Sequence, residues 1–340
     1  MLSPATEEVA DKDAKEEAAA QETPPVRRKT KEQRIAQKVE QALAIQEQGA
    51  KDAEQMGFIA RLLIQATMPH SKPRVHEWVR TNGNLTIHMM APSAVGLPYG
   101  CYARLLLVWI STQAAKNKAR LDRGHISEMN ARRLELGNSL SAFMSELGLH
   151  ATGGEEGSIG RLRNQMNRLF KTTISATYTE CNQEAGTVSE SESGARVADE
   201  SCLWWSTEKP AQGNLWSSWV ELSPKFFTLI TQRPVPLDMR VLRLIKRSPM
   251  ALDVYCWATY RVSYLRRATC IPWASLMAQI GTSYPFTGQG CRDFKKRFLE
   301  GLEKVKFAWP ELDAVPTARG LLLKPCAPHV SRRPRDLPSC

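Results

Sequence analysis

Two nine-residue stretches decide the fold of this chain: LSAFMSELG at residues 140–148 and WASLMAQIG at residues 273–281. Their apolar positions and their terminal glycine coincide when the second stretch is laid over the first. Each pattern is typical of a short helix that ends at glycine. Because similarity at a long fixed spacing indicates a duplicated unit, the sequence predicts two copies of one unit of about 130 residues.

Around the first stretch, hydrophobic periodicity and turn residues predict the order of elements in the first copy. The expected elements are a strand at 85–88, a helix at 99–116, a strand at 133–136, a helix at 139–147, a glycine-rich turn at 153–157, a basic helix at 158–170 and a closing strand at 172–179.

The second copy repeats this order. It begins at 234–237, and its long helix starts at Ser248 and Pro249, because a capping residue followed by proline is typical of a helix start. The expected elements are helices at 238–246 and 250–265, a strand at 269–271, a helix at 272–280, a turn at 288–290, a basic helix at 291–305 and a hairpin at 314–324.

The order helix, strand, helix, turn, basic helix, then strand or hairpin describes a winged helix, a variant of the helix-turn-helix. We therefore expect an α+β, mainly helical protein with two tandem winged-helix domains. The expected parts are a disordered or helical extension at 1–50, a first domain at 51–230 with a flexible acidic loop at 181–201, a second domain at 231–325 and a flexible tail at 326–340.

The composition favours a nucleic-acid partner. The 340 residues carry a net charge of +11, which attracts polyanions. The longest apolar run, 105–110, is far shorter than the roughly 20 residues of a spanning helix. Residues 1–21 are acidic and rich in alanine, unlike a secretory signal. We therefore expect a cytoplasmic protein with no membrane partner.

The sequence carries no catalytic motif. It has no GxxxxGK[ST], HExxH or GxSxG pattern, and its six histidines are scattered. None of its eight cysteines forms a CxxC pair, so we expect reduced thiols rather than a metal site. We predict that the protein is not an enzyme and needs no metal or cofactor.

The basic helix expected at 158–170 has two faces. Its apolar residues recur at helical spacing: Ile159, Leu162, Met166, Leu169 and Phe170. The opposite face carries the candidate DNA contacts Arg161, Asn164, Arg168 and Lys171. In a major groove, arginine can bind guanine bidentately and asparagine can bind adenine, so this face has the chemistry to read DNA.

The basic helix expected at 291–305 repeats the pattern. Its buried stripe is Phe294, Phe298, Leu302 and Val305, and its candidate DNA contacts are Thr287, Gln289, Arg292, Lys295 and Lys296. Acidic residues further along would repel phosphates, so the N-terminal half should enter the groove. Residues 231–309 hold 14 basic and five acidic side chains, so most of the excess positive charge of the chain lies in the second domain. Either helix alone could be an ordinary solvated helix with a basic face. The presence of two such helices, each after a short helix and a glycine-containing turn, favours DNA binding over this alternative.

Several runs of this sequence resemble the RepA-type replication initiators of bacterial plasmids, over residues 58–324. The resemblance is densest in GNLT at 83–86, GLPYG at 96–100, RLLL at 104–107, LELGNSLSAFM at 134–144, RPVPLDMR at 233–240, KRSPMALDVYCW at 246–257 and YRVSYLR at 260–266.

The resemblance implies an initiator that binds directly repeated origin sequences, called iterons, in double-stranded DNA. It implies help in opening the origin, and recruitment of the host proteins DnaA and DnaB helicase. It also implies two winged-helix domains, of which the first supports dimerisation with auxiliary DNA contact and the second binds DNA more strongly. From the family we expect a monomer–dimer equilibrium, with monomers on the iterons.

Two other functions stay open. A transcriptional repressor, even of its own gene, would carry the same DNA-binding helices without initiating replication. A nucleoid or RNA-binding protein would show weak sequence discrimination. Two unlike reading helices in one chain predict an asymmetric site of roughly 20 bp, whereas a repressor more often reads a palindrome.

Overall fold

The computed structural model describes residues 30–65, 67–137, 139–154, 157–182, 187–203, 218–281 and 284–330. The chain divides into two units, 1–40 and 41–340. Helix α2 (Lys31–Glu47) begins in the first unit. Its start is a capping box, in which Thr30 and Gln33 each accept the other's backbone N–H, at 3.2 and 3.0 Å. The extension at 1–50 is thus partly helical, and residues 1–29 and the tail at 331–340 lie outside the described residues.

The first copy is built on the long helix α4 (Gly100–Asp122), much of which is buried. After it come α5 (Glu128–Arg132), β4 (Arg133–Glu135), α6 (Leu140–Glu146) and α7 (Ser158–Phe170). Ser139 caps α6 by accepting the backbone N–H of Ala142 at 3.1 Å. Gly148 follows α6 with φ +71°, a conformation that glycine adopts without strain.

A three-stranded sheet completes the first copy. It consists of β4, β7 (Ala198–Cys202) and β8 (Trp219–Leu222), in the order β4-β8-β7, and all pairs are antiparallel. The strand that closes the copy is therefore β8, in the centre of its sheet. The strand expected at 172–179 belongs to another sheet.

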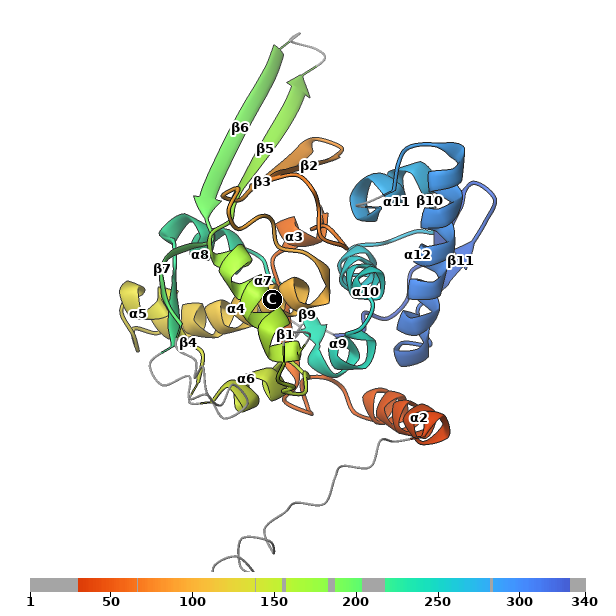
Figure 1. The fold of residues 1–340 in the computed structure, drawn as a ribbon. Coiled ribbons are helices and arrows are strands. Elements are labelled where there is room, and N and C mark those ends of the chain that lie inside the picture. The colour runs from red at the N-terminus through yellow and green to blue at the C-terminus, as the bar shows by residue number, and fades with distance from the viewer. Residues whose placement is uncertain are drawn as a thin grey trace, which may run out of the picture. The chain divides into compact units, whose positions relative to one another are not determined.

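The second copy has the same topology (Figure 1). Its elements are α10 (Pro249–Val262), β10 (Thr269–Pro272), α11 (Trp273–Ile280), α12 (Gly288–Ala308), β11 (Ala314–Pro316) and β12 (Gly320–Leu323). Its sheet has the order β10-β12-β11, which matches β4-β8-β7 position by position. Helix α12 packs on α10, as α7 packs on α4. The duplication predicted from two helical stretches is thus present in the topology.

The copies differ by an inserted hairpin, β5 (Thr173–Asn182) and β6 (Thr187–Arg196), between α7 and β7. It extends an antiparallel sheet of order β2-β3-β5-β6 that contains β2 (Glu77–Asn82) and β3 (Leu85–Met90). Figure 1 shows the hairpin projecting beyond the rest of this sheet. The flexible acidic loop expected at 181–201 was wrong, because most of that stretch forms β6 and β7; residues 183–186 lie outside the described residues. The low-complexity composition of this stretch gave no sign that residues 187–196 pair with β5.

The two copies share one hydrophobic core. Strand β1 (Met56–Ile59), which precedes the first copy, pairs antiparallel with β9 (Val235–Asp238) at the start of the second, and α9 (Met239–Ile245) follows. Helix α3 (Arg61–Gln65) packs on α10, and α8 (Pro224–Thr231) packs on α4. Residues on both sides of the boundary expected at 230/231 thus lie in a single unit, 41–340.

A buried ion pair joins the long helices of the two copies. Arg104 on α4 donates from Nε and Nη2 to the two carboxylate oxygens of Asp253 on α10, each at 2.7 Å. His70 Nε2 lies 2.7 Å from Asp253 Oδ2, and Arg104 also donates to the carbonyl oxygens of Met68, Pro69 and Gly100. Burial alone would raise the pKa of Asp253, but the Arg104 charge and the hydrogen bonds hold it below its usual value.

Candidate nucleic-acid interface

Helix α12 is fixed at its start and along one face. Thr287 caps it by accepting the backbone N–H of Gly290 at 3.1 Å. Gly290 is required there because a Cβ would collide with the carbonyl of Pro285. The expected stripe is fully or almost fully buried: Phe294, Phe298, Leu302 and Val305. Aromatic edge contacts of Phe298 with Trp257 and Trp273 tie α12 to α10 and α11.

The opposite face of α12 is exposed at Gln289, Arg292 and Lys296. Gln289 accepts from Arg292 Nη2 at 2.8 Å and donates to Asp293 Oδ1 at 2.9 Å, so it holds the guanidinium in one direction. Lys295 is half-buried, with its ammonium 5.0 Å from the centre of the Trp273 ring. These first turns present polar and cationic groups that can donate to DNA bases and phosphates.

The far end of α12 is less basic. Arg297 donates to Glu300 at 2.9 Å, and Glu303 is exposed one turn further. Since these carboxylates would repel phosphates, the charge pattern favours contact through the N-terminal turns. Phe286, 65% exposed in the turn before α12, adds an apolar surface that the helical pattern could not indicate.

The hairpin β11–β12 lies beside α11, which packs on α12. Trp273 on α11 donates from Nε1 to the carbonyl of Thr317 at 3.1 Å, which holds the hairpin turn against α11. The turn exposes Arg319, and Lys324 pairs with Asp313 at 3.3 Å. Arg319 is therefore a second candidate for a cationic contact with DNA, beside the candidates on α12.

Helix α7 buries the five apolar residues expected from its sequence. Its exposed side holds Arg161, Asn164 and, after its end, Lys171. Arg163 is exposed as well, although the helical pattern did not single it out. At the start of the helix, the hydroxyls of Thr152 and Ser158 each accept the other residue's backbone N–H, both at 2.9 Å, which fixes the loop that leads into α7.

Arg168 was wrong as a candidate DNA contact. It is only 8% exposed, donates from Nε to Asn164 Oδ1 at 2.6 Å and from Nη1 to the carbonyl of Leu97 at 3.2 Å, and lies over the ring of Tyr99. Nearby, buried Gln165 accepts the backbone N–H of Tyr99 at 2.9 Å. The loop before α4 has backbone groups that need partners, and the polar flank of α7 supplies them.

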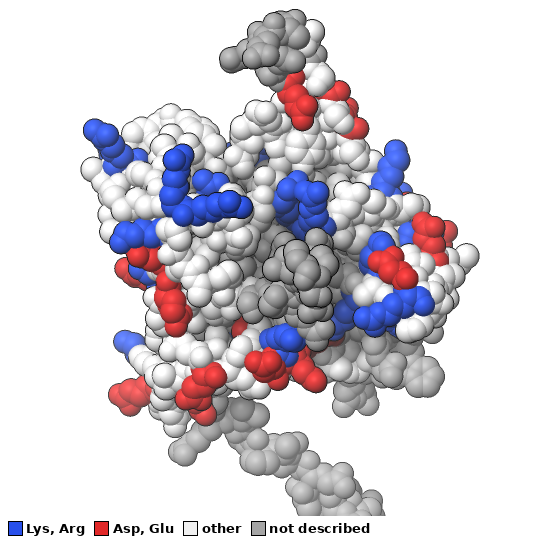
Figure 2. Space-filling view, turned by 180° about the vertical axis from the view of Figure 1, so that it is seen from behind, with Lys and Arg blue, Asp and Glu red and all other residues white. Residues whose placement is uncertain are grey.

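The surface charge is uneven. Figure 2 shows acidic side chains near the end of the projecting hairpin β5–β6, and Glu180, Glu190 and Glu192 are exposed on its two strands. Basic side chains lie at several separate places elsewhere on the same face of the molecule (Figure 2). The hairpin end therefore repels a phosphate backbone, and DNA contact through it is disfavoured.

In the described part of the chain, no helix has the length and apolarity to cross a membrane. Two solved structures of domains 2 and 3 of RctB, one of them a selenomethionine form, are similar to this chain. They have TM-scores of 0.47 and 0.43, each at 10% sequence identity. They cover 78% and 77% of this chain and 95% and 96% of their own. No curated protein sequence matches significantly.

The family model described as "Plasmid encoded RepA protein" matches residues 97–275. The match runs from the start of α4 into α11, so it includes the long helices of both copies, the first basic helix and the Arg104–Asp253 pair. It covers more than half of the chain, and the chain belongs to the RepA family of plasmid replication initiators.

Proposed function

We propose that the protein initiates plasmid replication by binding directly repeated origin sequences through two winged-helix units. The observation that carries the proposal is the repeated topology. In each copy a long helix, a strand, a short helix and a basic helix are followed by two strands in one sheet, which is the order of a winged helix. The basic helix exposes cations on the side away from the core in both copies.

In the second copy, α12 would enter the major groove with its N-terminal turns first. That groove is about 12 Å wide and admits an α-helix. Arg292, held by Gln289, would bind a base edge, and Lys296 would bind a phosphate. Hairpin β11–β12 would act as the wing, with Arg319 on the backbone or minor groove. The larger charge of this half makes it the main binding unit.

In the first copy, α7 would make the auxiliary contact through Arg161, Arg163, Asn164 and Lys171. Arg168 has no part in this contact, because it is committed to the loop before α4. Strands β7 and β8 would form the wing of this copy. The acidic end of β5–β6 would point away from the duplex, since its carboxylates repel phosphates.

Family membership also supports the remaining roles. The monomer would bind each iteron, in equilibrium with a dimer that forms through the first copy. On the origin it would promote opening of adjacent DNA and recruit DnaA and DnaB helicase. Sedimentation with and without iteron DNA tests the oligomer, and an obligate dimer on every repeat would contradict it.

The test of the reading helix is a set of variants measured for thermal unfolding and for affinity to an origin fragment at two salt concentrations. Arg292→Ala should weaken specific binding by about 1–3 kcal/mol and relax selectivity at one or two base pairs. Lys296→Ala should weaken binding evenly across sequences and reduce the salt slope by about one. Phe298→Ala should unfold the protein more easily, by roughly 3–5 kcal/mol.

Arg120→Ala is the matched control, because it removes an exposed cation that lies in the last turn of α4 and on neither basic helix. If the two α12 variants stay folded and bind like this control, α12 is not the reading element. Footprinting separates initiator from repressor: two unlike reading units predict protection of asymmetric direct repeats of roughly 20 bp. Protection of palindromes alone would favour the repressor.

A further inference from the structure

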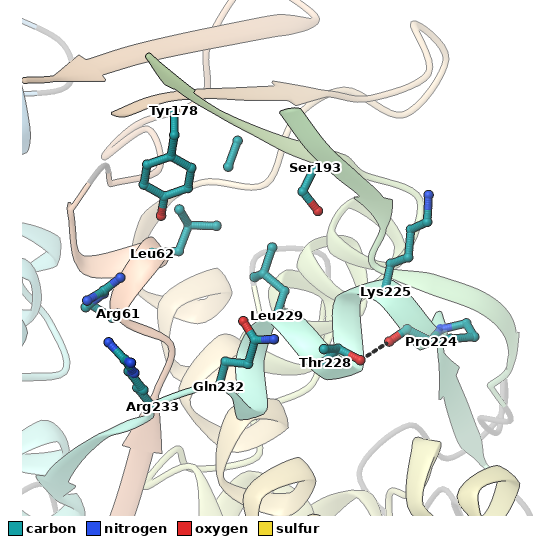
Figure 3. Close-up of a pocket in the computed structure, with 11 residues that line it drawn as sticks. Arg61, Leu62, Tyr178, Ser193, Pro224, Lys225, Thr228, Leu229, Gln232 and Arg233 are labelled. Carbon is teal, nitrogen blue, oxygen red and sulfur yellow. Dashed lines mark hydrogen bonds between the residues drawn. The ribbon is translucent and has the colours of Figure 1, made fainter. Parts of the chain in front are cut away.

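A cavity of about 740 Å³ lies between the inserted hairpin β5–β6 and helix α8, and the residues that line it belong to neither basic helix. One wall is the face of β5 and β6 that carries Ala176, Tyr178 and Ser193. The other wall is α8 with Gln232, the residue after it, and Arg61 and Arg233 border one end (Figure 3).

The sequence explains why space remains here. Ala176 on β5 pairs directly with Ser193 on β6, so two small side chains face α8 where larger ones would fill the gap. Leu62 and Leu229 contribute apolar surface, and Tyr178, 37% exposed, contributes an aromatic ring. A cavity with an apolar floor and few polar groups at its rim is the usual form of a small-molecule site, for which volumes of roughly 300–1,000 Å³ are common.

The charges at the rim have one sign. Arg61, Lys225 and Arg233 line the cavity, and none of its described lining residues is acidic. Figure 3 shows Arg61 and Arg233 at the same end, with the Tyr178 hydroxyl turned toward them and Lys225 at the other end. Arg61 also lies near the hydroxyl of Tyr260, which adds no negative charge. Two guanidinium groups on one rim repel each other, and an anion bound between them would remove that repulsion.

The backbone conformation of Arg233 also supports an anion-binding site at this end of the cavity. Its φ is +51°, in the left-handed region that residues with a Cβ rarely adopt, and Pro234 restricts it further. A strained arginine persists where the surroundings hold it, and such residues cluster at binding sites. Here the strain places a guanidinium at the mouth of a cavity beside a second one.

We propose that this cavity binds a nucleotide unit, with its phosphate between Arg61 and Arg233 and its base against Tyr178. Arginine matches phosphate oxygens with two parallel hydrogen bonds, and tyrosine stacks on any base. The nucleotide is either free or part of a single strand, because both present the same phosphate and base. None of the exposed cations of α7 or α12 lines the cavity, so the site is additional to the proposed duplex interface.

The test is calorimetric titration of the full-length protein with thymidine monophosphate and with a single strand of about eight thymidines, a typical length for one such site. Binding of both probes identifies a free nucleotide as sufficient, and binding of the strand alone identifies single-stranded DNA. Arg61→Gln and Arg233→Gln should each weaken binding by about tenfold or more, as loss of a charge-assisted contact does. Ser193→Phe should block the cavity without changing its charge.

Arg120→Gln is the control for loss of one exposed cation, and thermal unfolding checks the fold of each variant. The three cavity variants should keep the affinity of the wild type for duplex origin DNA, whereas Arg292→Ala should lose it and keep the nucleotide site. The proposal is overturned if neither probe binds at millimolar concentration, or if Ser193→Phe binds as the wild type does. It is also overturned if folded cavity variants lose duplex binding in parallel.

Discussion

Replacing Asp253 by asparagine would remove the acid that joins the two copies. Asp253 is 6% exposed and accepts both hydrogen bonds of the Arg104 fork, with a third from His70. Asparagine keeps the size but leaves the buried guanidinium without a counter-charge. Breaking a buried pair in this way costs about 3–5 kcal/mol. At about 2–4 °C per kcal/mol for a large domain, the melting temperature should fall by roughly 6–20 °C.

Denaturant and thermal unfolding of Asp253→Asn, followed by circular dichroism, measure this loss. The control is Asp313→Asn, which breaks an exposed pair with Lys324 and should change stability by roughly 0.5 kcal/mol or less. Arg104→Met combined with Asp253→Leu should cost less than the sum of its single changes, because no charge is left buried. A loss below about 1 kcal/mol for Asp253→Asn would refute the reasoning.

Two further predictions concern α7 and pH. Arg168→Ala should lower the free energy of unfolding by about 1–3 kcal/mol, through two lost hydrogen bonds, and leave the DNA affinity of the folded protein unchanged. Arg161→Ala should weaken DNA binding and leave the free energy of unfolding unchanged. Unfolding and binding assays on both variants test the two predictions. Burial lowers the pKa of His70 below its usual 6.5 although Asp253 opposes the shift, so below that pH the unfolded chain binds more protons than the native state. Stability should therefore fall as the pH drops from about 6.5 through the folded-state pKa. Replacing His70 by Gln should flatten this part of the pH profile, and an unchanged profile would reassign it to His329, whose pKa burial also lowers.

Local signals predicted the helices well. The pattern expected at 158–170 is α7 itself, and the stretches that end at Gly148 and Gly281 are α6 and α11. Capping residues and apolar spacing act within a few residues, so they can be read without knowing the rest of the fold. The same holds for the buried stripe of α12.

Long-range pairing could not be predicted in this way. Strand β8 takes the centre of its sheet from a position far along the chain from β4, and β1 pairs with β9 across the whole first copy. A strand's own residues do not identify its partner, which is why the strand expected to close the first copy at 172–179 instead pairs with β3 and β6. The acidic, low-complexity composition of 187–196 indicated a loop. Its pairing with β5 could not be predicted from these residues, because the pairing depends on the partner strand.

Some candidate DNA contacts are exposed and one is buried, for a related reason. A helical wheel separates apolar from polar positions, but it does not say whether a polar flank meets water or another segment. On α12 the flank of Arg292 and Lys296 is exposed. On α7 the flank of Gln165 and Arg168 is covered by the loop at 96–99, which needs hydrogen-bond partners.

This difference between the copies bears on which of them reads DNA. The topology is the same, yet the first copy commits the flank of its basic helix to its own loop and carries an inserted hairpin with an acidic end. The second copy has no such insertion between α12 and β11, and it leaves Gln289, Arg292 and Lys296 exposed beside a short hairpin. Since phosphate attraction and base contact both need accessible donors, this difference supports the proposal that the second copy is the main DNA-binding unit. The first copy would then contribute orientation: the Arg104–Asp253 pair and the β1–β9 pairing join it to the second copy, so that under the proposed function one binding event would set the direction of both copies on an asymmetric site.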